Sequence, residues 1–159
     1  MPGVGKSTIG VVLAKILGME FVDSDLIIQK SQGKLLKEII SEVGTNGFLT
    51  IEDEVHADLN VNNSIIATGG SVVYCQNGME HLRDISIIVY LKLDYDLLAH
   101  RLGNLTARGV VLREHQTLQD LYKERTPLYE KYAHITIDET SLNIEQTIDA
   151  ILKALHRAK

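Results

Sequence analysis

The first eight residues, Met-Pro-Gly-Val-Gly-Lys-Ser-Thr, carry the most specific chemical pattern in the chain. They match the end of the phosphate-binding pattern G-x-x-x-x-G-K-[ST], whose opening glycine would fall one residue before Met1. In such a loop, glycines let backbone N–H groups point at phosphate oxygens, the lysine reaches the β- and γ-phosphates, and the serine hydroxyl reaches Mg²⁺. The apolar run 9–17 predicts a helix whose N-terminal dipole faces the same phosphates. An ordinary glycine-rich turn before a helix is the alternative. The pattern favours a nucleotide site made of Gly3, Val4, Gly5, Lys6, Ser7 and Thr8.

A buried parallel strand normally precedes a loop of this kind, and no strand precedes residues 1–8. We therefore expect the natural protein to carry roughly ten more residues at its N-terminus, an apolar strand that ends in glycine. Without that strand, two neighbouring strands would each lose a hydrogen-bond partner. Sequencing the N-terminus of the native protein tests this expectation.

Two aspartates, Asp23 and Asp25, follow a short predicted strand over residues 19–23. The carboxyl ends of strands in open α/β sheets are where ligands bind. One carboxylate can lie toward the metal ion held by Ser7, and the other toward the hydroxyl of a phosphate acceptor. The alternative is that Asp25 only caps the helix that follows.

Further candidate site residues come from later in the chain. Gly69 and Gly70 end a predicted strand at 64–68 and permit a ligand to approach the backbone. The segment 103–116 lacks periodicity and contains Arg108 and Arg113, so it predicts a mobile, basic lid. We place Arg113 on the surface and Arg108 near a ligand.

The next segment predicts a helix that begins after Thr117, which caps it, and continues to about Tyr132. This helix contains Arg125 and Pro127. Its position in the chain favours ligand contact for Arg125.

The length of 159 residues predicts one domain, residues 1–159. Hydrophobic residues make up 45% of the chain and charged residues 23%, as is ordinary for a globular domain. The net charge of −5 argues against a nucleic-acid surface. A single cysteine, Cys75, fits a reducing compartment, and the apolar runs are too short to span a membrane, so we expect a cytoplasmic location. Strands that alternate with helices predict a three-layer α/β/α sandwich with a mainly parallel sheet.

Five segments, in their order and spacing, resemble the shikimate kinase family among the nucleoside-monophosphate-kinase-like P-loop proteins. They are GVGKST at 3–8, FVDSD at 21–25, F-x-x-x-E at 48–52, ATGG at 67–70 and ERTPLYEKYA at 124–133. The resemblance covers nearly the whole chain. It implies a P-loop NTPase fold with a mobile lid and an ATP-dependent kinase that uses Mg²⁺.

On the acceptor side, the resemblance implies that Asp25 holds the acceptor hydroxyl and assists its deprotonation. Gly69 and Gly70 would line the acceptor pocket, and Arg125 would pair with the carboxylate of the acceptor. The helical segment at about 25–60 would form the rest of this pocket.

On the nucleotide side, the resemblance implies that Asp23 joins Ser7 in the metal shell. Arg108 would be the lid arginine on the transferring phosphate, and Arg101 would lie along the adenine. Together with Lys6, Arg108 would stabilise the charge of the transferred group.

The chain departs from the family pattern at three places. The family motif F-R-x-x-E has Leu49 in place of its arginine, and the triple glycine has Ser71 in place of its third glycine. The lid motif R-P-L reads Arg108-Gly109-Val110. A leucine cannot replace the charged contacts of an arginine, so the acceptor side is altered while the nucleotide side is kept.

These observations favour a monomeric kinase that converts shikimate and ATP to 3-phosphoshikimate and ADP in aromatic amino-acid biosynthesis. Leu49 and Ser71 leave open a kinase for another small hydroxy acid, such as homoserine. A third possibility is a nucleotide-binding regulatory protein without turnover.

Overall fold

The computed structural model describes residues 1–103 and 115–157. The helices of this part are α1 (Lys6–Leu17), α2 (Ser24–Gln32), α3 (Leu36–Ala57), the short 3₁₀ helix η1 (Val72–Tyr74), α4 (Gln76–Ile85), α5 (Tyr95–Leu102), α6 (Leu118–Tyr132) and α7 (Ile144–Arg157). The strands are β1 (Glu20–Asp23), β2 (Ser64–Ala67), β3 (Val89–Lys92) and β4 (Ile135–Asp138).

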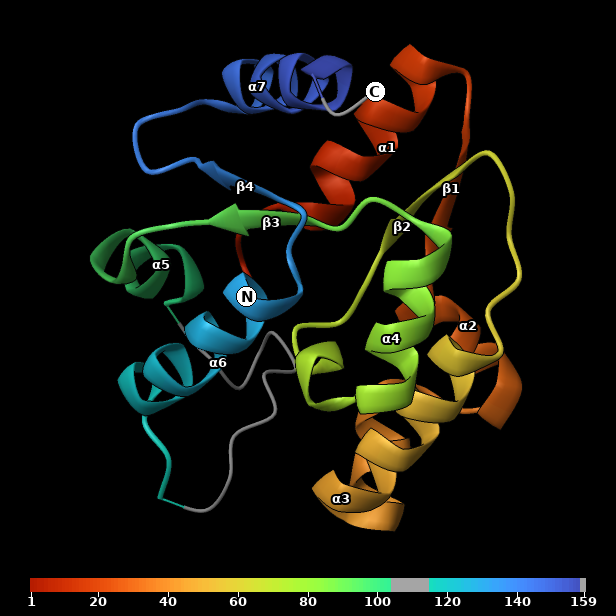
Figure 1. The fold of residues 1–159 in the computed structure, drawn as a ribbon. Coiled ribbons are helices and arrows are strands. Elements are labelled where there is room, and N and C mark those ends of the chain that lie inside the picture. Colours follow the sequence, from red (N-terminus) through yellow and green to blue (C-terminus); the bar gives the residue numbers. More distant parts are fainter. Residues whose placement is uncertain (104–114, 158–159) are drawn as a thin grey trace.

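The strands form two parallel pairs with helices on both sides. β1 pairs with β2, so that Asp23 lies opposite Ala67, and β3 pairs with β4, so that Lys92 lies opposite Asp138. Figure 1 shows α1 and α7 on one side of the strands, α4 and α6 on the other, and α2 and α3 beyond the end of β1. The predicted three-layer α/β/α sandwich is confirmed.

A cavity separates the two strand pairs. In the described part of the chain, β2 and β3 are not joined by a ladder of hydrogen bonds. The space between them has a volume of about 860 Å³, and its lining is largely apolar. The lining includes residues 64–67 of β2, residues 89–91 of β3, Met1, and Ile9 and Leu13 of α1. The upstream strand expected from the sequence stays a prediction.

The helices pack on two larger apolar cores and a small one. The first core joins α1, α5, α6 and α7 to β3 and β4, with Leu98 and Leu121 almost fully buried. The second lies under η1 and α4, and the third fixes Ile28 of α2 against Ile39 and Phe48 of α3. The second core also joins Ile66 of β2 to Leu128, Tyr129 and Tyr132 of α6. Among the residues described, no helix has both the length and the hydropathy of a membrane span.

Candidate active site

The loop before α1 has the backbone geometry of a phosphate-binding loop. Gly3 and Gly5 adopt positive φ angles of 79° and 97°, which side chains disfavour. A Cβ atom on Gly3 would lie 2.7 Å from Cδ2 of Leu102, so no larger residue fits there without a shift. Ser7 and Thr8 lie exposed in the first turn of α1, where the free N–H groups of a helix attract anions.

Lys6 lies where its charge faces the acidic residues of the site. Its Nζ donates a hydrogen bond of 2.8 Å to the carbonyl oxygen of Met1. Burial lowers the pKa of Lys6, and the nearby carboxylates of Asp25 and Asp23 oppose that effect. The predicted lysine and both predicted aspartates therefore lie close enough to act on one another.

The ends of β1 and β2 bring Asp23, Asp25 and the two glycines to one edge. Asp23 caps α2, because its Oδ1 accepts a hydrogen bond of 3.0 Å from the amide of Asp25. The alternative role of Asp25 as the helix cap is therefore wrong. Burial raises the pKa of Asp25, the charge of Asp23 raises it further, and Lys6 lowers it.

Gly69 leaves room for two carboxylates. A Cβ atom on Gly69 would lie 2.7 Å from Oε1 of Glu52 and 3.0 Å from Oδ1 of Asp25. The absence of a side chain at this position therefore lets both acids face the same space.

Arg125 of α6 lies beside Gly70, as the sequence predicted for two residues of one pocket. The arginine is buried, and its Nη1 lies 3.1 Å from the position that a Cβ atom on Gly70 would take. Its Nε donates to the hydroxyl of Tyr74 at 3.4 Å, and its guanidinium lies 5.2 Å from the centre of that ring. The hydroxyl of Tyr129 donates to the carbonyl of Gly70 at 2.6 Å, which ties α6 to the end of β2.

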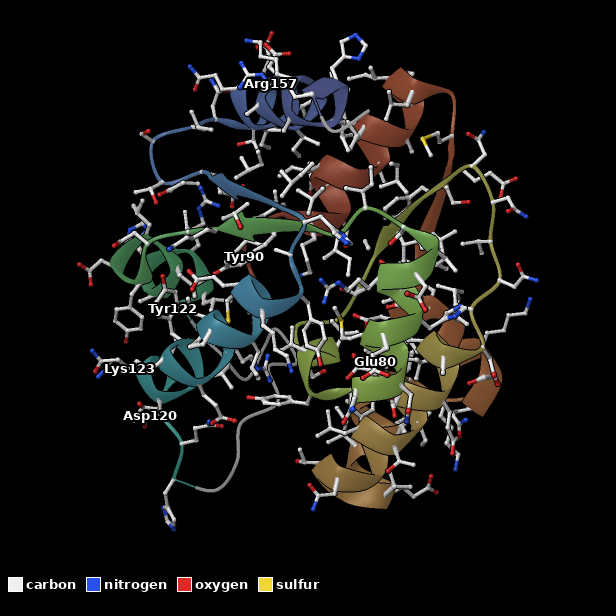
Figure 2. The ribbon with its side chains drawn as sticks, viewed as in Figure 1. Glu80, Tyr90, Asp120, Tyr122, Lys123 and Arg157 are labelled. Atoms are coloured by element: carbon white, nitrogen blue, oxygen red, sulfur yellow. The ribbon has the colours of Figure 1, made fainter. Side chains whose placement is uncertain are left out.

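Stacked aromatic rings hold α6 in this position. Tyr90 lies between β3 and α6 (Figure 2), and its ring stacks on that of Tyr129 with the ring centres 5.0 Å apart. Two turns earlier on α6, the hydroxyl of Tyr122 donates to the carbonyl of Leu93 at 2.9 Å. These contacts fix the helix that carries Arg125.

A second pocket, of about 510 Å³, opens beside the phosphate-binding loop. Its lining includes Gly5 and Thr8 of the loop, Arg101 of α5, Glu139 after β4 and Asn143 before α7. Nη1 of Arg101 lies 3.5 Å from Oε1 of Glu139. The structure therefore brings Arg101 to the loop, where the base or ribose of a nucleotide would lie if its phosphates bind at residues 3–8.

Arg108 and most of the predicted lid, residues 103–116, lie outside the described residues. Sequence reasoning gave no role to Tyr74 or Glu139, because a single tyrosine and a lone acid have no motif. It gave none to Tyr129 either, although that residue stands in the segment at 124–133. Glu52 stands in the segment at 48–52, and that match was the one available signal for it.

The residues predicted for a metal ion suit Mg²⁺. The hydroxyl of Ser7 is exposed, and Asp23 uses one carboxylate oxygen for its helix cap while the other makes no hydrogen bond within the described residues. Within residues 1–103 and 115–157, no cluster of three or more His, Cys, Asp or Glu side chains could bind a metal by itself. Mg²⁺ bound with nucleotide phosphates needs one or two protein ligands, so this donor set fits.

The fold and the loop define a nucleotide-binding α/β protein of the P-loop kinase type. A family model described as shikimate kinase matches residues 2–156. The chain therefore belongs to the shikimate kinase family, whose members are ATP-dependent phosphotransferases.

Individual relatives agree with the family match. The shikimate kinase of Bacillus anthracis (strain CDC 684 / NRRL 3495) is 33% identical over 155 residues, which cover 97% of this chain and 93% of that protein. The shikimate kinase of Thermodesulfovibrio yellowstonii is 34% identical over 158 residues, with coverage of 98% and 91%.

Solved structures of the family share the fold. A shikimate kinase from Acinetobacter baumannii in complex with shikimate superposes with a TM-score of 0.87 at 34% identity, covering 99% of this chain and 89% of the other. Shikimate kinase from Aquifex aeolicus gives a TM-score of 0.82 at 27% identity, with coverage of 96% and 90%.

Proposed function

We propose that this chain transfers the γ-phosphoryl group of ATP to a hydroxyl of shikimate, giving 3-phosphoshikimate and ADP. The observation that carries the proposal is the convergence of Lys6, Asp25 and Arg125 on the carboxyl ends of β1 and β2. A phosphate-binding cation, a base and a carboxylate-binding cation thus lie around one space, beside a loop shaped for phosphates.

Asp25 is the proposed base. The hydroxyl oxygen of the acceptor forms a bond to the γ-phosphorus while the bond from that phosphorus to the bridging oxygen of ADP breaks. The proton of the hydroxyl passes to a carboxylate oxygen of Asp25. Burial that raises the pKa of Asp25 makes this carboxylate a better proton acceptor than an exposed aspartate.

Lys6 is the proposed partner of the transferred phosphoryl group, with Arg108 as a second cation from the lid. Residues Gly3, Val4, Gly5, Ser7 and Thr8 would hold the phosphates through backbone N–H groups and hydroxyls. Mg²⁺, held by Ser7 and Asp23, would neutralise charge on the phosphate oxygens. Arg101 would lie along the base in the pocket of about 510 Å³.

Arg125 is the proposed partner of the carboxylate of the acceptor. It is buried and held by Tyr74, so its guanidinium is already oriented before the substrate binds. Gly69 and Gly70 would let the ring of the acceptor approach the backbone.

The test is ADP release from ATP and Mg²⁺, with and without shikimate. Saturable, shikimate-dependent release is the expected result. Release that is equal in the two conditions, with ATP bound, would instead support a nucleotide-binding regulator.

A kinase for another hydroxy acid is the second candidate, and Leu49 and Ser71 favour it because they alter the acceptor side. The same assay with homoserine and other hydroxy acids decides between the two acceptors. A cytoplasmic location, as expected from the single Cys75 and the short apolar runs, is part of the proposal and is checked by fractionation of cells. A monomer is also part of the proposal and is checked by size-exclusion chromatography.

A further inference from the structure

Glu52 of α3 is a fully buried acid next to the proposed base. Its exposed fraction is 0%, and none of the ion pairs among the described residues involves it. A buried carboxylate without a donor is costly, so what satisfies Glu52 decides whether it can stay in this place.

Ser71 supplies the donor. Its Oγ donates a hydrogen bond of 2.6 Å to Oε2 of Glu52, and Sγ of Cys75 adds a weak contact of 3.8 Å to the same oxygen. Oε1 of Glu52 has no hydrogen-bond partner in the described residues. This second oxygen faces Gly69, at the point that Oδ1 of Asp25 also faces.

The two departures of the acceptor side meet on this one carboxylate. Positions 49 and 52 are three residues apart on α3, so side chains there are neighbours on the helix surface. An arginine at 49, as in the family motif, would stand one turn from Glu52, whereas Leu49 brings no donor. Ser71 brings a hydroxyl where the family pattern has a glycine without a side chain.

We propose that Ser71 is a positioning residue that takes over from the missing arginine at position 49, and that it turns Oε1 of Glu52 toward the acceptor. The proposal rests on the function proposed above and sharpens it. Asp25 accepts the proton of the acceptor hydroxyl that reacts. Glu52 accepts a hydrogen bond from a second hydroxyl, on the neighbouring carbon of the acceptor. The pocket therefore selects acceptors with two adjacent hydroxyls over acceptors with one.

The first test needs no substrate and no turnover. The variants Ser71→Ala, Leu49→Arg and the double variant are compared by thermal unfolding. Ser71→Ala should lower the Tm by roughly 3–8 °C, because Glu52 loses its donor. The loss should be at least halved when arginine is also present at position 49. Ser24→Ala is the matched control, because Ser24 is also buried and its hydroxyl has no hydrogen-bond partner in the described residues, so the Tm of this variant should change little.

Tm shifts of Ser71→Ala and Leu49→Arg that simply add would overturn the coupling between the two positions. That result stands whether or not shikimate is the acceptor. A failure of the proposed function would show differently, as wild-type protein that releases no ADP with shikimate.

The second test measures what Glu52 recognises. Wild type and Glu52→Ala are compared with shikimate and with its analogue that lacks the hydroxyl next to the reacting one. In wild type the analogue should have a KM roughly ten-fold higher, with a smaller change in kcat, since one hydrogen bond to a charged or strongly polar group is lost. In Glu52→Ala the two compounds should differ by less than about two-fold. Equal discrimination by both proteins would overturn the role of Glu52.

Ser71→Ala provides the readout for positioning. It should raise the KM for shikimate while the KM for ATP is unchanged. The same Ser71→Ala change made in the Leu49→Arg protein should raise the KM for shikimate by less than half as much, measured against Leu49→Arg alone. A Ser71→Ala variant with wild-type KM for both substrates would show that Ser71 serves only to fill space.

Discussion

The nucleotide side and the acceptor side of this site are built in different ways. The phosphate-binding part of the nucleotide side is one continuous stretch, residues 3–8, whose backbone geometry and helix N-terminus suit phosphates. The acceptor side gathers side chains from α2, α3, the turn before η1, and α6. The first can be read from a short motif, whereas the second depends on which distant residues touch. Substrate specificity can therefore change on one side while phosphate binding is kept on the other.

Lys6→Ala should give the largest effect, a loss of ADP release of about 10³-fold or more, because it removes the cation aimed at the transferred charge. Initial rates at saturating ATP and shikimate measure it. Lys15→Ala, on the exposed side of the same helix, is the control and should keep the wild-type rate. A Lys6→Ala protein with near-normal rates would show that Lys6 does not stabilise the transferred phosphoryl group, and would contradict this account of the nucleotide side.

Asp25→Asn should lower kcat by about 10²–10⁴-fold with a small change in the KM for ATP, because only the proton acceptor is lost. Steady-state kinetics with each substrate varied in turn check this. An unchanged kcat would show that Asp25 is not the proton acceptor.

Glu52→Gln should change the pH dependence of stability. Burial raises the pKa of Glu52 from its ordinary 4.5 to about 7, and the hydrogen bond from Ser71 opposes the rise. The folded state therefore favours the protonated acid, so the stability that this group contributes is complete below about pH 4.5 and is lost as the pH rises through 7.

The glutamine variant cannot ionise, and it should be more stable than wild type at pH 8 by up to about 3 kcal/mol, relative to their difference at pH 4.5. Urea unfolding at both pH values measures this. Glu54→Gln, exposed on the same helix, should show no such change.

Leu49→Arg should strengthen shikimate binding by about 1.5–3 kcal/mol if the new cation reaches the carboxylate of the acceptor. ATP binding should stay as in wild type, which would confirm that the two sides are independent. Isothermal titration with each ligand checks both statements. Unchanged shikimate affinity would contradict this account of the pocket.

Most of the fold and of the nucleotide side could be predicted from the sequence, because they depend on local patterns. Thr117 caps α6 as predicted, since its hydroxyl accepts from the amide of Asp120 three residues later. The glycine pattern of the phosphate-binding loop is also local, because it lies within the six residues 3–8.

Less of the acceptor side could be predicted, because its contacts join residues far apart. Ser71 and Glu52 are 19 residues apart, and Tyr129 and Gly70 are 59 residues apart. Neither pair follows from helix or strand periodicity. Even locally, the choice between Asp23 and Asp25 as the cap of α2 depended on where the strand ends and the helix begins, which propensity does not resolve.

The cavity between β2 and β3 has a mechanical consequence. β2 and β3 border this cavity of about 860 Å³ and share no ladder in the described residues, so the two strand pairs can move apart without breaking backbone hydrogen bonds between those strands. Increasing urea should therefore separate the two strand pairs before either pair unfolds. The chain has six tyrosines and no tryptophan, and the stacked rings of Tyr90 and Tyr129 at β3 would report that separation through tyrosine fluorescence.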